Sequence, residues 1–176
     1  MRNEHLIILL LCGILAACDN PNEQTSGSAT TGTISEKDTV PRVTGIGGIF
    51  FIADDPQKIM GWYGDNLGLA IDDFGSPFEF RNAHRPDEIN YLRWHPQPDS
   101  SDYFNPSSKP FMINYRVNNI EGLVAKLEEK GITMLDEIST FEYGKFVHLM
   151  DPEGNKIELW EPVDSFLTQL GGATTK

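Results

Sequence analysis

Cysteine is scarce in this chain of 176 residues. Its two cysteines, Cys12 and Cys18, both lie at the extreme N-terminus. A disulfide framework and a cysteine metal cluster are therefore excluded from the rest of the sequence. Basic residues are also few, since 14 Lys and Arg stand against 26 Asp and Glu and the net charge is −12. An acidic surface repels phosphate backbones, so we expect no nucleic acid partner.

Long apolar runs are missing as well. The run at residues 6–15 is too short to cross a bilayer as a permanent helix, and after Arg2 it is typical of a secretory signal peptide. It ends in Leu-Ala-Ala-Cys18, which resembles the lipobox of bacterial lipoproteins. The resemblance implies cleavage after residue 17 and a lipid on the thiol of Cys18. We expect a protein of the cell envelope, lipid-anchored to a membrane outside the cytoplasm; a plain secretory signal or a buried helix is the alternative.

Large apolar residues are rare in residues 18–41, which are rich in Ser, Thr, Gly, Asn and Asp. Such a segment cannot bury enough surface to offset the entropy of ordering it, so we predict a flexible tether. The sequence then predicts one folded domain at residues 42–163 and a C-terminal tail at residues 164–176.

The domain contains one order of elements twice. Strand, helix and three strands are predicted at residues 42–53, 55–68, 69–73, 78–81 and 89–94. A proline-rich connector follows at residues 95–110. The same order then returns at residues 111–117, 118–131, 132–138, 143–150 and 156–161. The repeat distance is about 63 residues, and an internal repeat indicates two similar modules.

The repeat predicts an α+β fold in which two βαβββ modules pair into one curved mixed sheet. We expect this sheet to form a cup, with the helices outside. Gly45, Gly47 and Gly48 leave room on one face of the first strand. A phosphate-binding loop is excluded there, because the glycines lie within the strand and no Lys-Ser/Thr pair follows them.

The last hairpin places one acid among apolar residues. If its turn is residues 151–155, simple pairing sets His148 opposite Glu158. Strand alternation points one set of side chains to the helices: Val147, Leu149, Ile157 and Leu159. The other set points into the cup: Phe146, His148, Met150, Lys156, Glu158 and Trp160.

Other strands add side chains to the cup. Met112, Asn114 and Arg116 share its face, and Phe50 joins them from the first strand. We predict that Phe50, Asn114, Arg116 and Trp160 contact a ligand. A second set of aromatic residues is suited either to an apolar pocket or to core packing: Trp94, Trp160, Phe50 and Phe80.

The pair of His148 and Glu158 has three interpretations at this stage. It can be a catalytic acid/base unit in which the carboxylate orients the imidazole. It can be half of a metal site. It can also be a structural or ligand-contact pair whose members satisfy each other.

Several motifs together resemble the vicinal oxygen chelate superfamily, which includes glyoxalases, bleomycin resistance proteins and extradiol dioxygenases. The motifs are Asp54-Asp55-Pro56, Trp62-Tyr63, Leu67-Gly68-Leu69, Asn114-Tyr115-Arg116-Val117, Gly131-Ile132 and residues 151–162. The resemblance implies the two-module cup. It leaves the chemistry open, because this fold hosts lyases, epimerases, dioxygenases and metal-free binding proteins.

The resemblance also implies where a divalent metal would bind. Glu158 matches the final acidic ligand of the family, but the first-strand ligand would fall at Gly48 and its partner near Met112. Neither is a usual ligand for a hard divalent ion. The family's ligand set is therefore incomplete, and the sequence leaves the cofactor unknown.

Three functions follow from these observations. The leading one is a lipid-anchored domain that binds a small organic ligand in the cup, with weak or metal-free catalysis through His148 and Glu158. The alternative is a metal-dependent lyase or dioxygenase that uses the same two residues. The third is a structural or partner-binding envelope lipoprotein. Two modules in one chain allow a monomer to complete the cup, and a homodimer is also compatible.

Overall fold

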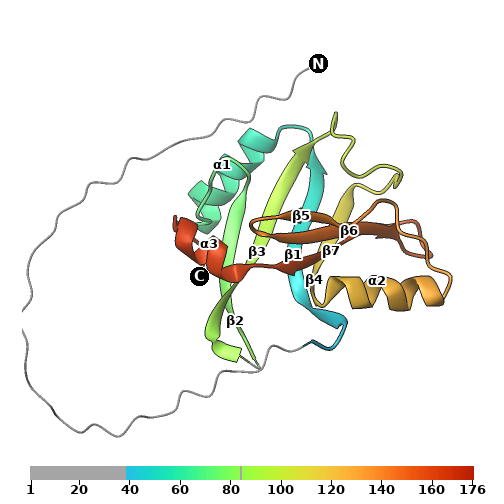
Figure 1. Ribbon diagram of the computed structural model, residues 1–176. Coiled ribbons are helices and arrows are strands. Elements are labelled where there is room, and N and C mark those ends of the chain that lie inside the picture. The colour runs from blue at the N-terminus through green and yellow to red at the C-terminus, as the bar shows by residue number, and fades with distance from the viewer. Residues whose placement is uncertain (1–38, 84) are drawn as a thin grey trace, which may run out of the picture. The chain divides into compact units, whose positions relative to one another are not determined.

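The computed structural model describes residues 39–83 and 85–176, so residues 1–17, Cys18 and nearly all of the tether lie outside the described residues. Figure 1 shows the elements of the described part. Its strands are β1 (Arg42–Ala53), β2 (Ser76–Asn82), β3 (Arg85–Pro98), β4 (Phe111–Asn118), β5 (Ser139–Phe141), β6 (Gly144–Met150) and β7 (Lys156–Pro162). Its helices are α1 (Pro56–Leu67), α2 (Ile120–Glu129) and α3 (Asp164–Leu170).

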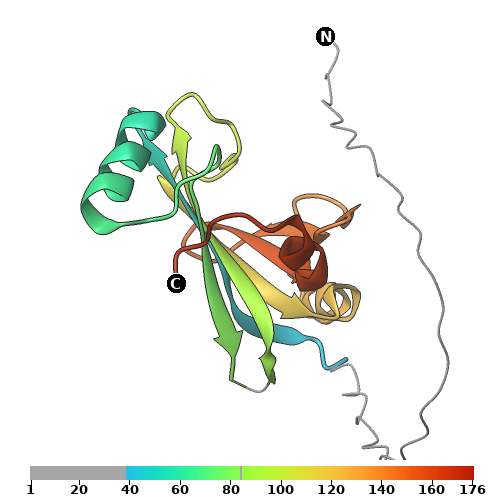
Figure 2. The ribbon, with the colours of Figure 1, turned by 90° about the vertical axis from the view of Figure 1, so that its left-hand side faces the viewer.

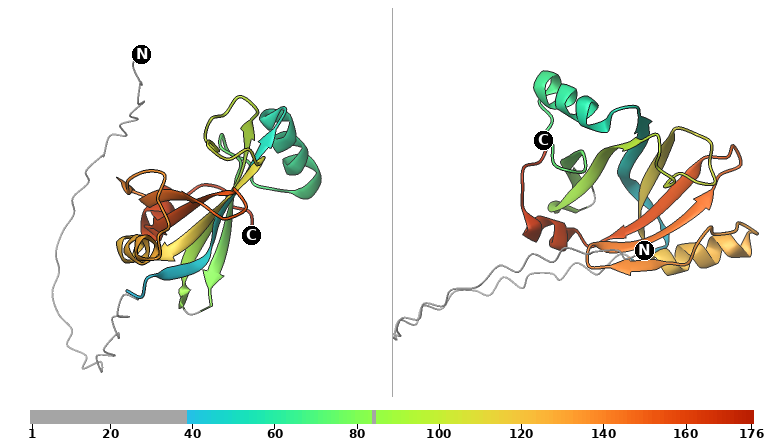
Figure 3. Two further views of the ribbon diagram at one scale, coloured as in Figure 1. Left: turned by 90° about the vertical axis from the view of Figure 1, so that its right-hand side faces the viewer. Right: turned by 90° about the horizontal axis from the view of Figure 1, so that it is seen from above.

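All strands of the described part join one sheet in the order β2-β3-β1-β4-β7-β6-β5. Figure 3 shows that this sheet is curved. β1 pairs with β3 in parallel, and β4 pairs with β7 in parallel. The two modules meet where β1 and β4 run antiparallel. The predicted α+β fold, with two modules in one mixed sheet, is therefore confirmed.

The ends of α1 and α2 follow from residues recognised in the sequence. The side chain of Asp55 accepts a hydrogen bond of 3.0 Å from the backbone N–H of Lys58, and Gly68 ends α1 with φ 72°. The side chain of Asn119 accepts one of 3.0 Å from the N–H of Gly122 at the start of α2. Figure 2 shows α1 and α2 at opposite ends of the sheet.

The second module carries a compact core between α2 and the sheet. Its buried members are Val117, Ile120, Val147, Leu149 and Leu159, and Leu123, Val124, Leu127 and Ile157 pack against them. Strand alternation assigned four of them to the helix side: Val147, Leu149, Ile157 and Leu159. The same alternation sends the intervening residues of β6 and β7 to the opposite face, where the candidate site lies.

Two predicted strands are wrong. Residues 69–73 form only an isolated bridge between Asp72 and Gly75, because the side chain of Asp72 accepts from the N–H of Phe74 and turns the backbone. Residues 132–138 also form only a bridge, at Met134. There the side chain of Asp136 accepts the N–H of His148 over 2.8 Å, in place of the carbonyl that a paired strand would supply.

The connector is shorter than predicted, because β3 continues through residues 95–98. The residues after 163 contribute α3 and a parallel bridge between Thr175 and Phe78. Asp164 forms an ion pair with Arg116, and Thr175 donates its N–H to the carbonyl of Pro77 over 2.8 Å. The C-terminal residues are thus bonded to both modules.

Candidate functional site

Glu158 and His148 face each other across the last hairpin, so the predicted register is confirmed. The N–H of Asp151 donates to the carbonyl of Asn155 over 3.0 Å, and Gly154 adopts φ 79° within the turn. This turn fixes which residues of β6 and β7 are opposed. The Nε2 atom of His148 lies 3.0 Å from Oε2 of Glu158.

Three further side chains complete the surroundings of this pair. The side-chain amide of Asn114 donates to Oε1 of Glu158 over 2.6 Å, and the hydroxyl of Tyr103 donates to Oε2. Behind His148, Oδ2 of Asp136 lies 2.6 Å from Nδ1 of the imidazole. A continuous hydrogen-bonded chain therefore runs from Tyr103 through Glu158 and His148 to Asp136.

Tyr103 and Asp136 were missed by the sequence analysis. Tyr103 lies in the connector, where the adjacent aromatic residues Tyr103 and Phe104 are the signal that could have drawn attention to it. Asp136 lies in a segment wrongly predicted as a strand. Neither position follows from spacing, because tertiary contacts decide where both segments run.

Burial and charge perturb the proton equilibria of this chain. Burial alone lowers the pKa of His148, but the hydrogen bond and charge of Glu158, together with Asp136, outweigh it and raise that pKa. Burial first, and then the charge of Glu158, raise the pKa of Tyr103, so its hydroxyl stays a donor. Burial lowers the pKa of Lys156, whose Nζ atom donates to the backbone carbonyl of Tyr103 over 2.7 Å.

The residues around Glu158 do not fit a divalent metal. Gly48 offers no side chain, and Met112 is fully buried in a cluster with Phe50 and Phe104. Both carboxylate oxygens of Glu158 already accept hydrogen bonds, and His148 directs Nε2 at one of them. Among residues 39–83 and 85–176, no group of three or more His, Cys, Asp and Glu side chains is arranged to hold a metal ion.

A second polar cluster surrounds Arg116, which is only 3% exposed. Its guanidinium forms an ion pair with Asp164 of α3 and donates to the carbonyl of Tyr91 over 2.9 Å. The same group lies 5.1 Å from the ring of Trp160 and 5.8 Å from the ring of Phe80. Arg116 and Trp160, both predicted ligand contacts, are therefore brought together.

The Glu158 and Arg116 clusters meet over Gly47. A Cβ atom at this position would lie 2.2 Å from Oδ1 of Asn114, 2.7 Å from Trp160 and 3.0 Å from Arg116. The absence of a side chain is thus what lets these three residues lie against β1, as the glycine pattern predicted. Phe50, the remaining predicted contact, is 9% exposed and packs with Met112 and Phe104.

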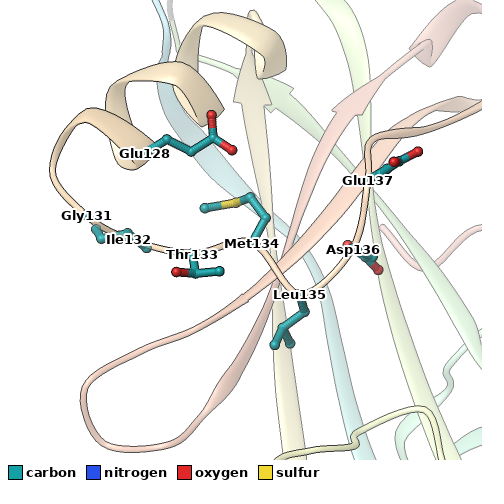
Figure 4. A pocket seen from close by; sticks show the side chains of 8 residues that line it. All are labelled: Glu128, Gly131, Ile132, Thr133, Met134, Leu135, Asp136 and Glu137. Carbon is teal, nitrogen blue, oxygen red and sulfur yellow. The ribbon is translucent and has the colours of Figure 1, made fainter.

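An open depression of about 560 Å³ lies beside this chain of hydrogen bonds. It is lined by Glu128 and by residues 131–137, which connect α2 to β5 (Figure 4). Asp136 belongs to its lining and also bonds to His148. One end of the hydrogen-bonded chain therefore reaches the surface of the domain.

Comparisons with known proteins agree with this architecture. The model of the Glyoxalase/Bleomycin resistance protein/Dioxygenase superfamily matches residues 45–159. No curated protein matches the chain.

Among solved structures, the Mn(II)-bound glyoxalase from Novosphingobium aromaticivorans aligns with a TM-score of 0.52 and 16% identity, covering 78% of this chain and 43% of that one. A methylmalonyl-CoA epimerase from Streptomyces coelicolor aligns with a TM-score of 0.50 and 15% identity, covering 69% and 99%. The epimerase from Mycobacterium tuberculosis aligns with a TM-score of 0.49 and 17% identity, covering 72% and 93%. At these identities the likeness to the first two structures concerns the fold alone.

Proposed function

The chain belongs to the glyoxalase/bleomycin resistance protein/dioxygenase superfamily, and from this premise we propose that it binds a small organic ligand in the cup between its modules. Glu158 and His148 are the polar groups of the proposed site, and Phe50, Asn114, Arg116 and Trp160 are its remaining contacts. The same pair exchanges a proton with the bound ligand, without a metal.

One observation carries this proposal. Glu158 is a carboxylate only 3% exposed, yet it has no Lys or Arg salt bridge among the described ion pairs and is held by Asn114, His148 and Tyr103. Burying an acid in this way costs free energy unless donors surround it. At a position suited only to packing, an apolar residue would cost less free energy to bury than an acid. The presence of an acid at this position therefore supports a role in binding.

The proton exchange rests on the position of His148 between two carboxylates. Asp136 holds Nδ1 and Glu158 faces Nε2, so the ring orientation is fixed from both sides. The raised pKa of His148 favours the protonated form that donates to Glu158. A ligand bound beside Glu158 can take the proton from Nε2 of the charged imidazole, which becomes neutral, and can later give the same proton back to Nε2.

The ligand site is tested with the full chain carrying Cys18→Ser, which cannot be acylated. A library of small carbonyl compounds, carboxylic acids and phenols is screened by amide chemical shifts, and binders are repeated with Glu158→Gln. We expect binders whose shifts centre on Asn114, His148 and Glu158 and whose affinity falls in the variant. A screen without any such binder would refute the proposal and favour a structural role.

The competing metal-dependent lyase or dioxygenase gives a different result in the same preparation. Stoichiometric Mn, Fe, Ni or Zn that disappears in Glu158→Ala would favour that enzyme and overturn the metal-free proposal. Metal content below stoichiometry in both proteins agrees with the proposed site.

The proposed location outside the cytoplasm rests on the lipobox-like sequence that ends at Cys18. No helix of the described residues is long and apolar enough to cross a membrane. Radiolabelled palmitate should label the wild-type chain in bacteria and not Cys18→Ser. Labelling of both proteins would contradict the proposed anchor.

A further inference from the structure

The connector between β3 and β4 inserts one aromatic side chain into the candidate site. The hydroxyl of Tyr103 donates to Glu158, and its ring meets Phe50 and His148 edge-on, with centroid distances of 6.2 and 5.9 Å. The ammonium of Lys156 lies 5.1 Å from the centre of the same ring. Every part of this phenol thus has a partner in the cup.

The rest of the connector does not depend on Tyr103. Phe104 is 4% exposed and anchors the segment in the cluster of Phe50 and Met112. The hydroxyl of Ser107 donates to the carbonyl of Gly154 over 2.6 Å. Tyr103 itself is 36% exposed, so its side chain can rotate toward solvent while these two anchors remain in place.

We propose that Tyr103 is a built-in occupant of the ligand site and that the ligand is a neutral one-ring phenol that takes its place. This inference rests on the proposed function and names the chemical class of its ligand. The ligand hydroxyl donates to Glu158, and its ring occupies the space between Phe50, His148 and Lys156. Tyr103 then turns outward, because two phenols cannot share one carboxylate position.

The hydrogen bonding of the site favours this class over an acid. Oε2 of Glu158 accepts a hydrogen bond from the Tyr103 hydroxyl, so a ligand in that place must supply a donor, which an ionised carboxylate lacks. A hydrocarbon ring would fit the same edges but would leave that oxygen without this donor. A neutral phenol satisfies the shape and the hydrogen bond together.

The test uses 4-methylphenol, which reproduces the tyrosine side chain, and toluene, which differs from it only in the hydroxyl. Binding is measured by amide shifts for the wild type, Tyr103→Ala and Tyr103→Phe, all as full chains with Cys18→Ser. We expect Tyr103→Ala to prefer 4-methylphenol over toluene by roughly 10-fold or more. We expect the wild type to bind it more weakly, since Tyr103 must first be displaced, and Tyr103→Phe to lie between the two.

The outcomes separate this inference from the function on which it rests. Wild-type shifts at Tyr103, Asn114 and Glu158 on adding 4-methylphenol support displacement. Binding of 4-methylphenol to Tyr103→Ala alone would show that Tyr103 is a fixed packing residue. Equal affinity for 4-methylphenol and toluene would show that the site does not recognise the hydroxyl. Either result would overturn the inference. If 4-methylphenol has no effect while another library compound binds the cup, the inference fails and the proposed function stands. If Tyr103→Ala does not fold, the comparison of the wild type with Tyr103→Phe decides.

Discussion

Two charged side chains, Glu158 and Arg116, lie on the same face of the sheet, and each is 3% exposed. Arg116 is bound to Asp164, to a backbone carbonyl and to the face of Trp160. Within the described part of the chain, Glu158 is bound only by neutral or titratable side chains, among them Tyr103 from the connector. A permanent ion pair fixes the fold, whereas partners that can titrate or move away suit a site where ligands exchange.

The comparison is tested most strongly by removing the guanidinium group of Arg116. Arg116→Met should lower the free energy of unfolding by about 3 kcal/mol, because Asp164 would remain partly buried without its counter-ion. Chemical denaturation measures the change. Arg93→Met is the matched control, since its partner Asp72 is exposed and the expected loss is below about 1 kcal/mol. Equal losses in the two variants would contradict a structural role for Arg116.

A side chain added at Gly47 tests whether the Glu158 and Arg116 clusters need to approach β1 this closely. Gly47→Ala should destabilise the domain by about 2 kcal/mol, because its Cβ would collide with Asn114 and Trp160. Gly61→Ala is the control, since no atom lies within 4 Å of its added Cβ and it sits inside α1. The free energy of unfolding of this control should rise by about 0.5–1 kcal/mol. A neutral Gly47→Ala would show that the two clusters do not need this close approach.

Removing the charge of Glu158 should cost less, about 1 kcal/mol, because Gln keeps the shape and one acceptor oxygen. The clearer change in Glu158→Gln concerns His148, whose pKa should fall because the main interaction that raises it is lost. A titration of the imidazole followed by NMR measures it. An unchanged pKa in Glu158→Gln would mean that Asp136, and not Glu158, raises the pKa of His148.

The smallest expected effect is a dependence of stability on pH. The pKa of His148 is raised in the folded state above its ordinary 6.5, so its contribution is fully present below about pH 6.5. This stabilising contribution of His148 is lost as the pH rises through the pKa of His148 in the folded state. The Tm difference between the wild type and His148→Gln should therefore shrink from pH 6 to pH 8. A difference that grows over this interval would reverse the assigned direction.

The register of the last hairpin could be predicted because the length of the turn fixes which residues are opposed. Counting outward from the turn along both strands then gives each pair. That count placed His148 opposite Glu158, and the glycines of β1 predicted the space now filled by Asn114 and Trp160. Helix ends followed equally from local chemistry at Asp55, Gly68 and Asn119.

The parts that failed depend on contacts distant in sequence. Asp136 replaces a backbone acceptor beside β6, which turns a predicted strand into a loop. Tyr103 reaches Glu158, which is 55 residues away along the chain. Asp164 reaches Arg116 across 48 residues. Composition and periodicity describe a segment by itself, so they cannot say which distant side chain it will meet.

The late position of Asp164 has a consequence for biosynthesis. A ribosome completes every strand of the sheet before it adds Asp164, the acid that neutralises Arg116, and it adds Thr175, which bridges to β2, later still. Until then a growing chain that closed its sheet would hold a buried cation without its counter-ion. The domain therefore reaches its stable form only after residues 164–175 have been added.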